Sequence, residues 1–526
     1  MIMNKPLDIK NFEQTLGAEN CLSDLKAREL FSQDIWHKGE TVDFVISPRS
    51  TEQLANAVKL ADRKKIALNP RGSGMSYTKG YTSDLPNTGL IDFSKMNRIL
   101  EINQDDMYIT VEAGCTWKQI YDALSPLGLR TPFWGPLSGL KSTIGGGLSQ
   151  NNAFFGSGTY GPSTDSVTSL TVVLADGTIV KTGTAASASG KPFWRQYGPD
   201  ITGLFLSDAG ALGYKAEATL RLIPMPQSED WLSFEYDNQE SWINAQAEIG
   251  RLGIACELFG FDPTLQRVRM ERAGLAADVK TLGKVITNQK GGILKGLKEG
   301  AKVAMAGRSY MDDVAYSVHI VVEGHSDAEV KAKLATLKDI ALRYGGNEIE
   351  NSIPKIMRAN PFSPLNSVLG PRGERWVPIH GIVAMGDALD CQNDITKFFE
   401  EMSEEFEKFQ ITTGYLLTTL STNGFLIEPV FIWPEEIWPI HEQTVDKNTL
   451  KGITRFEQNP DATECVNRGR QGVMDIFSKY GAAHFQIGRT YPYRKTRSPE
   501  FNALLDGIKN LLDPDNRVNP GSLGLD

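Results

Sequence analysis

The stretch Ser142-Thr-Ile-Gly-Gly-Gly-Leu-Ser-Gln-Asn-Asn-Ala-Phe-Phe-Gly-Ser-Gly-Thr-Tyr-Gly161 leads into the apolar run Ser169-Leu-Thr-Val-Val-Leu-Ala-Asp-Gly177, and this combination decides the fold. A polar, glycine-rich loop is followed by a buried strand. Three consecutive glycines have no Cβ to hold a ligand away, so the backbone N–H groups at 145 to 147 can approach a pyrophosphate closely. An isolated glycine run is more often an ordinary surface loop. Loop and strand together predict a nucleotide cofactor.

A second glycine-rich turn, Asn69-Pro-Arg-Gly-Ser-Gly-Met-Ser-Tyr77, supports this interpretation. It follows a strand at 43–47, a helix that begins after the capping residue Ser50, and a strand at 66–68. A glycine turn directly after a buried strand is a common place for phosphate contact. The pattern continues with predicted strands at 89–93, 107–112, 170–174 and 216–224 and a predicted helix at 116–124. The chain therefore begins as an α/β domain.

Composition limits the possible functions. The chain has 526 residues, which predicts two domains, and its net charge of -9 argues against nucleic acid as a general partner. The five cysteines are scattered and odd in number, so neither a disulfide framework nor a metal site is expected. No apolar run reaches the roughly 20 residues of a membrane span, and the N-terminus lacks the apolar core of a signal peptide. We expect a cytoplasmic protein without stable membrane insertion.

Proline residues after 223 mark the predicted end of the first domain, at residues 1–225. A second domain is predicted over 226–475, with helices at 327–343 and 390–409 and strands at 317–323 and 425–432. Residues 476–526 are expected to return to the first domain, because Asn519-Pro-Gly521 favours a turn and apolar side chains lie next to it in the sequence. The basic, glycine-rich segment 290–305 is interpreted as a loop or a partner contact.

A set of motifs in fixed order carries a family resemblance. The motifs are Pro70-Arg-Gly-Ser-Gly-x-Ser76, Val111-Glu-Ala-Gly114, Thr143-Ile-Gly-Gly146, Tyr160-Gly161, Val173-Leu-Ala-Asp-Gly177, Asp200-Ile-Thr-Gly-Leu-Phe205, Ala211-Leu-Gly213 and Asn519-Pro-Gly521. Together they resemble flavoproteins of the vanillyl-alcohol oxidase and p-cresol methylhydroxylase (PCMH) type. The resemblance implies an α+β protein with a PCMH-type FAD-binding domain and an α/β cap domain that selects the substrate.

The resemblance and the donors in the two loops together assign the FAD contacts. The assigned residues are Pro70, Arg71, Gly72, Ser73, Gly74, Met75, Ser76, Pro136, Thr143, Gly145, Gly146, Ser149, Asn152, Tyr160, Gly161, Arg489 and Asn519. Several family members attach the flavin through a histidine, but the corresponding residue of the first turn here is Met75. In the other branch the linking residue lies on a cap strand, here 375–383, where Trp376 and His380 share a face. Our alignment places Trp376 at that position, so non-covalent FAD is expected.

Candidate catalytic residues lie in the segment Ala483-His-Phe-Gln-Ile-Gly-Arg-Thr-Tyr-Pro-Tyr493. The resemblance implies a Tyr-Arg pair that holds a phenolate, and here Arg489 follows Gly488, so Tyr491 and Tyr493 are expected to supply the hydroxyl. His380 is a further candidate. The alcohol-oxidising branch carries an Asp after Tyr-Gly, whereas Pro162 stands there in this chain.

The predicted function is FAD-dependent oxidation of a para-substituted phenol or aryl alcohol, with oxygen or an external acceptor taking the electrons. A FAD-dependent 2-hydroxy-acid dehydrogenase of the D-lactate or glycolate type is the first alternative. Such enzymes often carry a metal on paired histidines, and this chain offers only single ones. A lyase-type reaction on a phenol through a quinone methide is the second alternative. A homodimer is expected.

Overall fold

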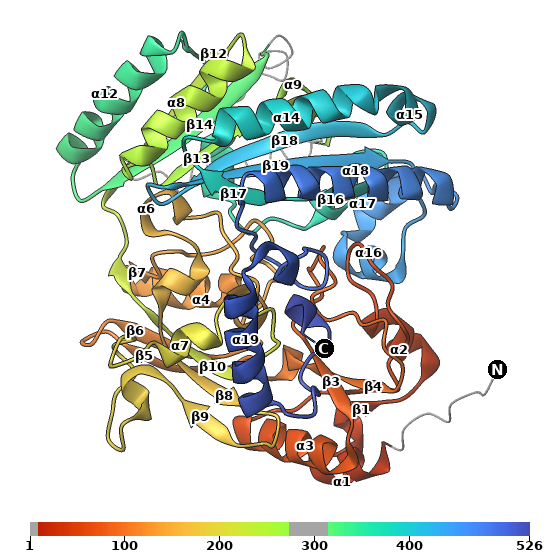
Figure 1. Ribbon diagram of the computed structural model, residues 1–526. Helices are drawn as coiled ribbons and strands as arrows, with labels where there is room; N and C mark the ends of the chain where they lie inside the picture. Colours follow the sequence, from red (N-terminus) through yellow and green to blue (C-terminus); the bar gives the residue numbers. More distant parts are fainter. Residues whose placement is uncertain (1–8, 273–313, 526) are drawn as a thin grey trace. The chain divides into compact units, whose positions relative to one another are not determined.

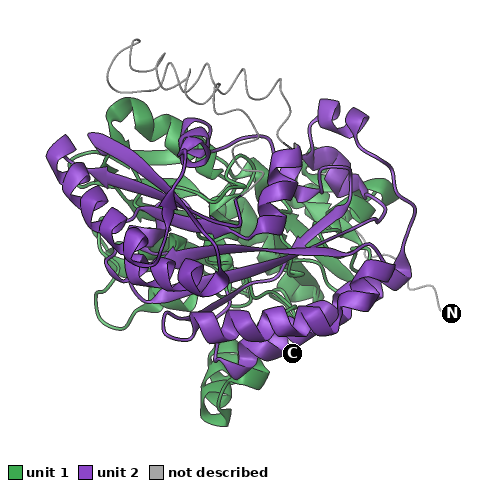
Figure 2. Ribbon diagram, turned by 90° about the horizontal axis from the view of Figure 1, so that it is seen from above, with its two compact units in different colours: residues 1–153, 162–225, 485–526 green, residues 154–161, 226–484 purple. Residues whose placement is uncertain are grey.

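The computed structural model describes residues 9–272 and 314–525, which form two compact units. The first unit contains Met1–Ala153, Pro162–Met225 and Phe485–Asp526, and the second contains Phe154–Gly161 and Pro226–His484 (Figure 2). Both units combine helices with sheets, which confirms the α+β class. The basic segment 290–305 lies outside the described residues.

The described part of the first unit contains two larger sheets and a two-stranded one, in which β11 pairs with β7. A four-stranded sheet has the order β1-β2-β4-β3, in which β4 is parallel to both β2 and β3, and a five-stranded antiparallel sheet has the order β5-β6-β10-β8-β9. The strands are β1 Cys21–Leu22, β2 Phe44–Ile46, β3 Ala67–Arg71, β4 Thr88–Asp92, β5 Ile99–Asn103, β6 Tyr108–Glu112, β7 Leu129–Arg130, β8 Val167–Val173, β9 Ile179–Lys181, β10 Tyr214–Arg221 and β11 Ile223–Pro224. The helices are α1 Lys10–Leu16, α2 Leu25–Phe31, α3 Thr51–Lys64, α4 Trp117–Leu124, α5 Ile144–Ser149, α7 Ile201–Leu204 and α19 Pro499–Leu512.

Local signals explain where the helices of this unit begin. The Ser50 side chain accepts a hydrogen bond from the backbone N–H of Gln53 and caps α3, and Thr116 and Gln119 form a reciprocal capping box at α4. Buried side chains of α1, α3 and the four-stranded sheet share one core, in which the rings of Phe12 and Phe44 are 4.7 Å apart.

The C-terminal tail completes the four-stranded sheet of the first unit. The backbone N–H of Leu68 donates to the carbonyl of Arg517, and Asn519 donates back to the carbonyl of Leu68, so the tail runs parallel to β3. The last residues of the chain are thereby fixed beside the strand that leads into the Arg71 turn.

The second unit contains an eight-stranded antiparallel sheet of order β15-β12-β14-β13-β18-β19-β16, with β17 also paired to β19. Its strands are β12 Ser228–Tyr236, β13 Glu257–Phe261, β14 Tyr316–Gly324, β15 Asn347–Glu348, β16 Arg375–Pro378, β17 Gly381–Ala384, β18 Thr412–Leu420 and β19 Gly424–Trp433. Its helices are α6 Ser157–Tyr160, α8 Gln239–Arg251, α9 Pro263–Arg272, α12 Asp327–Arg343, α13 Ser352–Ala359, α14 Ala388–Glu401, α15 Ser403–Lys408, α16 Pro439–Thr444, α17 Lys447–Gly452 and α18 Pro460–Lys479. Helices α8, α12, α14 and α18 lie along one face of this sheet (Figure 1).

Several local predictions can be compared with these elements. The predicted helix 327–343 is α12 at the same boundaries, whereas the predicted helix 390–409 is divided into α14 and α15. The predicted strand 375–383 is divided into β16 and β17. Both halves pair with β19 in one continuous register, since Trp376 pairs with Ile432 and Ile382 with Leu426.

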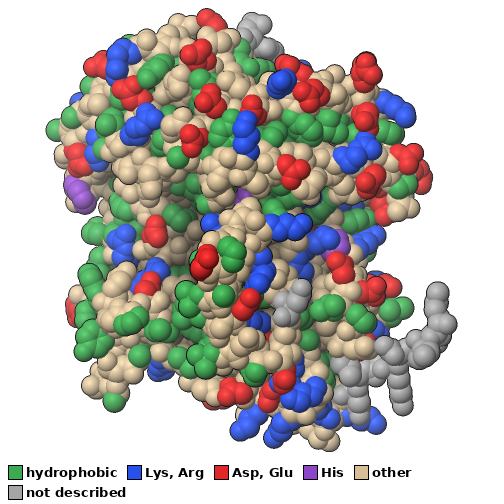
Figure 3. Space-filling view, viewed as in Figure 1, with side chains coloured by type: hydrophobic (Ala, Val, Ile, Leu, Met, Phe, Trp, Pro, Cys, Tyr) green, Lys and Arg blue, Asp and Glu red, His purple; other side chains and the backbone are tan. Residues whose placement is uncertain are grey.

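Surface chemistry is mixed. Acidic and basic side chains are interspersed over most of the face shown in Figure 3. Within residues 9–272 and 314–525, no helix combines the length and the apolar character needed to cross a membrane.

Candidate functional site

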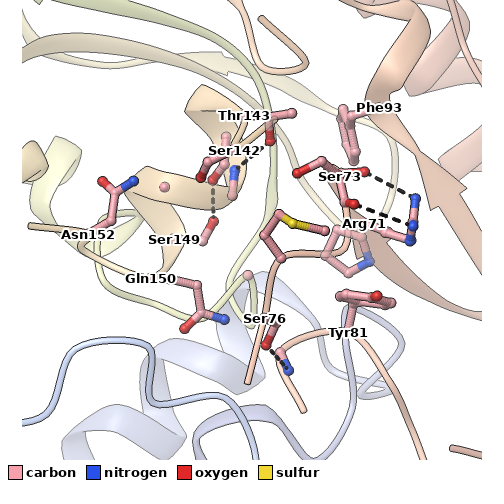
Figure 4. A pocket seen from close by; sticks show the side chains of 18 of the residues that line it. Arg71, Ser73, Ser76, Tyr81, Phe93, Ser142, Thr143, Ser149, Gln150 and Asn152 are labelled. Atoms are coloured by element: carbon pink, nitrogen blue, oxygen red, sulfur yellow. Dashed lines mark hydrogen bonds between the residues drawn. The ribbon is translucent and has the colours of Figure 1, made fainter. Parts of the chain in front are cut away.

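A pocket in the first unit is lined by both glycine-rich loops (Figure 4). It encloses about 970 Å³ of space, including its open side. Thirteen of the predicted FAD contacts line it: Pro70, Arg71, Gly72, Ser73, Gly74, Met75, Ser76, Pro136, Thr143, Gly145, Gly146, Ser149 and Asn152. Segments that are far apart in the sequence therefore meet at one site, as the motif order predicted.

The turn after β3 presents unpaired hydrogen-bond donors. Among the described residues, no protein acceptor receives the backbone N–H groups of residues 73–76. The carbonyl groups of Gly72 and Ser73 accept from the Arg71 guanidinium, at 3.3 and 3.5 Å, so these carbonyls face Arg71. Gly74 allows this path because its φ of 84° is in the region that favours glycine. The N–H groups therefore face the side opposite Arg71, and successive N–H groups that point to the same side form a concavity that can bind an anion. Residues 73–76 are called the donor loop below.

The Arg71 side chain packs against the donor loop and supports its conformation. Its guanidinium lies 4.5 Å from the ring centre of Phe31 and 5.4 Å from that of Tyr81, and it forms a long ion pair of 3.9 Å with Asp92. Arg71 is 8% exposed, and its guanidinium donates to the carbonyls of Gly72 and Ser73. Arg71 therefore acts mainly as an internal support for the loop.

The second loop differs from the sequence expectation. Gly145 donates its N–H to the carbonyl of Ala113 at 2.8 Å, and Gly147 donates to the carbonyl of Thr143 at 2.8 Å. Gly146 donates to the Thr143 hydroxyl at 3.4 Å. The bonds of Gly146 and Gly147 exist because Thr143 caps a helix that begins at Ile144, whereas Gly145 bonds to a distant segment of the chain. The N–H groups at 145 to 147 therefore all have protein acceptors. Residues 143–149 are called the capped loop below.

The glycines of the capped loop provide close approach. A Cβ at Gly147 would lie 2.7 Å from the side-chain nitrogen of Asn152 and 3.0 Å from the indole nitrogen of Trp117. A Cβ at Gly145 would lie 2.8 Å from the Cβ of Ala113. A side chain at either position would displace the neighbouring residues, so glycine here allows helix α5 to pack tightly beside Asn152.

The pocket contains buried polar atoms that lack protein partners. Both side-chain polar atoms of Asn152, the carbonyl oxygen of the Gln150 side chain and Nε of Arg71 make no hydrogen bond with the described residues. Asn152 is 5% exposed. An unsatisfied buried polar group is destabilising, so these atoms indicate a ligand that both donates and accepts hydrogen bonds. With the donor loop beside them, the residues fit the pyrophosphate and hydroxyl groups of FAD.

One wall of the pocket was not assigned from the sequence. It includes Ala209, Gly210, Gly213 and Lys215, with Tyr81, Phe93, Gln150 and Gln486 as further unassigned lining residues. The motif Ala211-Leu-Gly213 lies within this wall and was the available signal. Lys215 forms an ion pair of 2.6 Å with Asp208, and both side chains are buried.

Arg489 and Asn519 were predicted to bind the cofactor, but the structure places them outside the lining of the pocket, against Lys79 and Gly80. The Arg489 guanidinium donates to the carbonyls of Lys79 and Pro520, at 2.9 and 2.7 Å, and to the side-chain oxygen of Asn519 at 2.7 Å. Asn519 donates in turn to the carbonyls of Gly80 and Ala209. Burial lowers the pKa of Arg489 to about 10, which leaves it charged at neutral pH. These contacts fix the tail to the turn and favour a positioning role for both residues.

Gly488 explains why no tyrosine precedes Arg489. Its φ is 53°, and a Cβ at this position would lie 2.1 Å from the carbonyl oxygen of Thr78. Since the backbone itself leaves no room for a side chain at 488, a Tyr-Arg pair at 488 and 489 does not fit this turn. Tyr491 is 5% exposed and Tyr493 is partly exposed, and both belong to the first unit.

The remaining predicted residues belong to the second unit. Tyr160 and Gly161 lie at the end of α6, which packs with this unit. His380 lies between β16 and β17, is 2% exposed, and its carbonyl accepts from the His484 ring at 2.9 Å. Burial lowers the pKa of His380 to about 3, so its imidazole is neutral at physiological pH.

The second unit also contains a group of aromatic side chains. The rings of Phe154 and Phe259 are 5.6 Å apart, Phe259 and Phe261 are 5.6 Å apart, and Phe155 and Phe362 are 6.2 Å apart. In the described parts of the chain, His, Cys, Asp and Glu side chains form no group of three that could hold a metal ion.

Comparison with a family model identifies residues 42–183 as a FAD binding domain. Curated relatives match a little under half of the chain. Glycolate oxidase subunit GlcD of Bacillus subtilis is 31% identical over 239 residues, which are 45% of this chain and 49% of that protein. A probable mitochondrial D-lactate dehydrogenase of Danio rerio is 27% identical over 248 residues, 47% of this chain and 48% of that protein. The match thus spans about half the length of these relatives.

Solved structures match nearly the whole chain. An alkyldihydroxyacetonephosphate synthase has a TM-score of 0.69 at 16% identity, over 99% of this chain and 86% of its own. A substrate-bound p-cresol methylhydroxylase has a TM-score of 0.69 at 18% identity, over 98% of this chain and 96% of its own. The predicted PCMH-type fold is confirmed, and the match to a FAD binding domain indicates that the chain binds FAD.

Proposed function

We propose that this chain is an FAD-dependent oxidoreductase. The observation that carries the proposal is the donor loop, whose unpaired N–H groups line a pocket within a FAD binding domain. The similarity to an oxidase subunit and to a dehydrogenase supports the redox assignment. When bound, FAD accepts a hydride from a carbon–hydrogen bond of the substrate.

The first unit holds and orients the cofactor in this proposal. Residues 73–76 donate backbone N–H groups to the pyrophosphate, and Asn152 offers one donor and one acceptor. Arg71 keeps the carbonyls of the loop turned away from the anion. Arg489 fixes the loop to the C-terminal tail. In this proposal, backbone N–H groups make most of the contacts to the pyrophosphate, and side chains hold the loop in shape.

The favoured substrate is a para-substituted phenol or an aryl alcohol. Two observations support it: the Phe154, Phe259 and Phe261 rings form an apolar group in the second unit, and the structural match to p-cresol methylhydroxylase includes that unit. Aromatic side chains are common where small aromatic molecules bind. Tyr491, Tyr493 and His380 remain proposed contacts, with His380 acting as a neutral hydrogen-bonding group.

A 2-hydroxy acid is the second candidate substrate. The similarity to glycolate oxidase and D-lactate dehydrogenase favours it, as does Gly488, whose backbone excludes the tyrosine of a phenolate clamp. A lyase-type reaction on a phenol through a quinone methide remains the third candidate. An external acceptor or oxygen would take the electrons in the first two cases. A homodimer remains our proposal for the assembly.

Anaerobic reduction distinguishes these candidates. Purified protein with bound FAD is mixed with 4-alkylphenols, vanillyl-type alcohols, glycolate or D-lactate, and the visible flavin absorbance is followed. Bleaching by the phenols or aryl alcohols supports the favoured substrate, and bleaching by glycolate or D-lactate supports the second. If none of these donors lowers the flavin absorbance, the oxidoreductase assignment is contradicted.

The mode of flavin attachment has its own test. Met75 has no nucleophilic nitrogen, and we propose that FAD is bound without a covalent link. Acid precipitation should leave the yellow colour in the supernatant. Yellow colour in the protein pellet would contradict the proposal, and His380→Ala would then show whether this histidine forms the link.

A further inference from the structure

Lys215 is a buried cation on the wall of the pocket. It lies near the start of β10, is 4% exposed, and its ammonium nitrogen is 2.6 Å from a carboxylate oxygen of Asp208, which is 3% exposed. Both residues belong to the first unit. Removing two charges from water is costly, and a well-packed apolar pair is often equally stable. The pair therefore calls for a role beyond packing.

Asp208 and Lys215 differ in how fully they are satisfied. Asp208 accepts the ammonium of Lys215, the N–H of Gly210 at 3.0 Å and the N–H of Leu212 at 3.3 Å. A lysine ammonium has three donors, and within the described residues only Asp208 accepts from Lys215. Two donors of a buried ammonium are left for a group in the pocket.

Charge in the pocket points to an anion. Of the residues that line it, only Arg71 and Lys215 are charged, and none carries a carboxylate, within the described parts of the chain. The hydrogen bonds of Arg71 go to the carbonyls of Gly72 and Ser73. Lys215 therefore adds two spare donors to the single one that Nε of Arg71 leaves unpaired.

The wall that carries Lys215 touches the start of the Arg71 turn. Ala209 and Gly210 have φ values of 48° and 71°, which form a tight turn held by Asp208. A Cβ at Gly210 would lie 3.0 Å from the ring of Pro70, directly before Arg71. The Asp208 carboxylate thus fixes both the turn and Lys215 on the side of the pocket that adjoins the first loop.

We propose that Lys215 is a FAD-binding residue that donates to the pyrophosphate oxygens and that Asp208 positions it. The inference rests on the proposed FAD site and extends it to a residue outside the two loops. Asp208 remains paired in the absence of the cofactor and orients the ammonium, while the unpaired donors face the anion. Charge-assisted hydrogen bonds of this kind are stronger than neutral ones.

The test measures ligand affinity of the apoprotein rather than activity. FAD, ADP and riboflavin are titrated into wild type, Lys215→Met and Lys215→Arg by calorimetry or fluorescence quenching. We expect Lys215→Met to weaken the binding of FAD and of ADP by at least about tenfold at low salt. The affinity for riboflavin should be unchanged, because only riboflavin lacks phosphate. The difference from wild type should narrow as salt is raised, and Lys215→Arg should restore part of the affinity.

Lys509 provides a matched control. It is also a buried lysine of the first unit, but its three donors are used by Asp513 and by the carbonyls of Ala211 and Val518, and it does not line the pocket. Lys509→Met should lower thermal stability while leaving FAD affinity within about twofold. If Lys215→Met fails to fold, the neutral double variant Asp208→Asn with Lys215→Met removes the unpaired carboxylate and takes its place.

The outcomes separate the two proposals. A wild type that does not bind FAD contradicts the proposed function itself. If the wild type binds FAD and the folded Lys215→Met variant binds it with equal affinity, only the role of Lys215 is contradicted. The assignment to the pyrophosphate would also be overturned if the affinities for riboflavin and ADP fell equally, or if the loss of affinity did not depend on salt.

Discussion

The donor loop and the capped loop line the same pocket, and both are rich in glycine and serine. In the donor loop, residues 73–76 keep their N–H groups free of protein acceptors. In the capped loop, Gly145 and Gly147 donate to the carbonyls of Ala113 and Thr143. Similar composition therefore yields donors in one loop and closely packed helix in the other.

What separates the two loops is the origin of their shape. The helix of the capped loop begins at a local signal, the Thr143 cap, although Ile144 and Gly145 also bond to Cys115 and Ala113. The donor loop depends on partners that are far away in sequence, because Arg489 and Asn519 hold the residues that follow it. A loop with unpaired donors has fewer bonds of its own and needs such external support. The comparison predicts that the donor loop is the more sensitive to distant changes.

The largest effect is expected from Arg489→Ala. This change removes the hydrogen bonds to the carbonyls of Lys79 and Pro520 and to Asn519, and it leaves buried acceptors unpaired. We expect a loss of about 3 kcal/mol or more in the free energy of unfolding, together with loss of bound FAD. Chemical denaturation and the ratio of flavin to protein absorbance measure the two effects.

Arg497→Ala is the control for this change. Arg497 is exposed and lies 5.0 Å from the ring centre of Tyr493, so its removal should cost less than about 1 kcal/mol and spare FAD. Slow flavin reduction by Arg489→Ala with unchanged stability and full FAD content would instead establish Arg489 as a residue that contacts the substrate.

Gly488→Ala is expected to have the next largest effect. Gly488 has a φ of 53°, and the added Cβ would meet the carbonyl oxygen of Thr78 at 2.1 Å. Strain and overlap together should destabilise the protein by about 3 kcal/mol. Gly481→Ala isolates the strain, because Gly481 has a φ of 60° and open space around its Cβ, and it should cost about 1 kcal/mol. Equal melting temperatures for the two variants would contradict the close approach at Gly488.

A proline in the donor loop tests the unpaired N–H groups directly. Ser73→Pro removes one donor, and Ser73→Ala keeps the donor and removes only the hydroxyl. We expect the proline variant to bind FAD about tenfold more weakly and the alanine variant to bind it within about twofold of wild type. Titration of the apoprotein with FAD provides the comparison. Equal affinities would show that the donor loop does not bind the anion through its backbone.

Local signals in the sequence predicted the elements that depend on neighbouring residues. Ser50 and Thr116 cap the helices where the sequence placed them, and the boundaries of α12 agree with its hydrophobic pattern. The sites of the cofactor motifs were equally visible, because glycine runs after apolar strands have a distinct composition. Local chemistry thus determined both the helices and the place of the pocket.

The features that were missed depend on distant partners. Nothing local in the sequence shows that the N–H of Gly145 bonds to Ala113, a residue on another segment. The pairing of Asp208 with Lys215 requires a turn with positive φ at Ala209 and Gly210, which sequence spacing alone does not indicate. The order of the strands in the second unit is likewise set by long-range pairing. The substrate is harder to predict than the cofactor for the same reason.

The smallest effect is expected from Gly146→Ala in the capped loop. Its N–H already donates to the Thr143 hydroxyl, and the nearest protein atom to an added Cβ is that same oxygen at 3.2 Å. Alanine also favours a helix by about 1 kcal/mol over glycine, so the apoprotein should be as stable as wild type or slightly more stable. Because the methyl group would occupy space at the pocket wall, FAD affinity should fall by only about two- to fivefold, less than for Ser73→Pro. A larger loss than in Ser73→Pro would reverse the comparison, since the capped loop would then make the closer contact with the pyrophosphate.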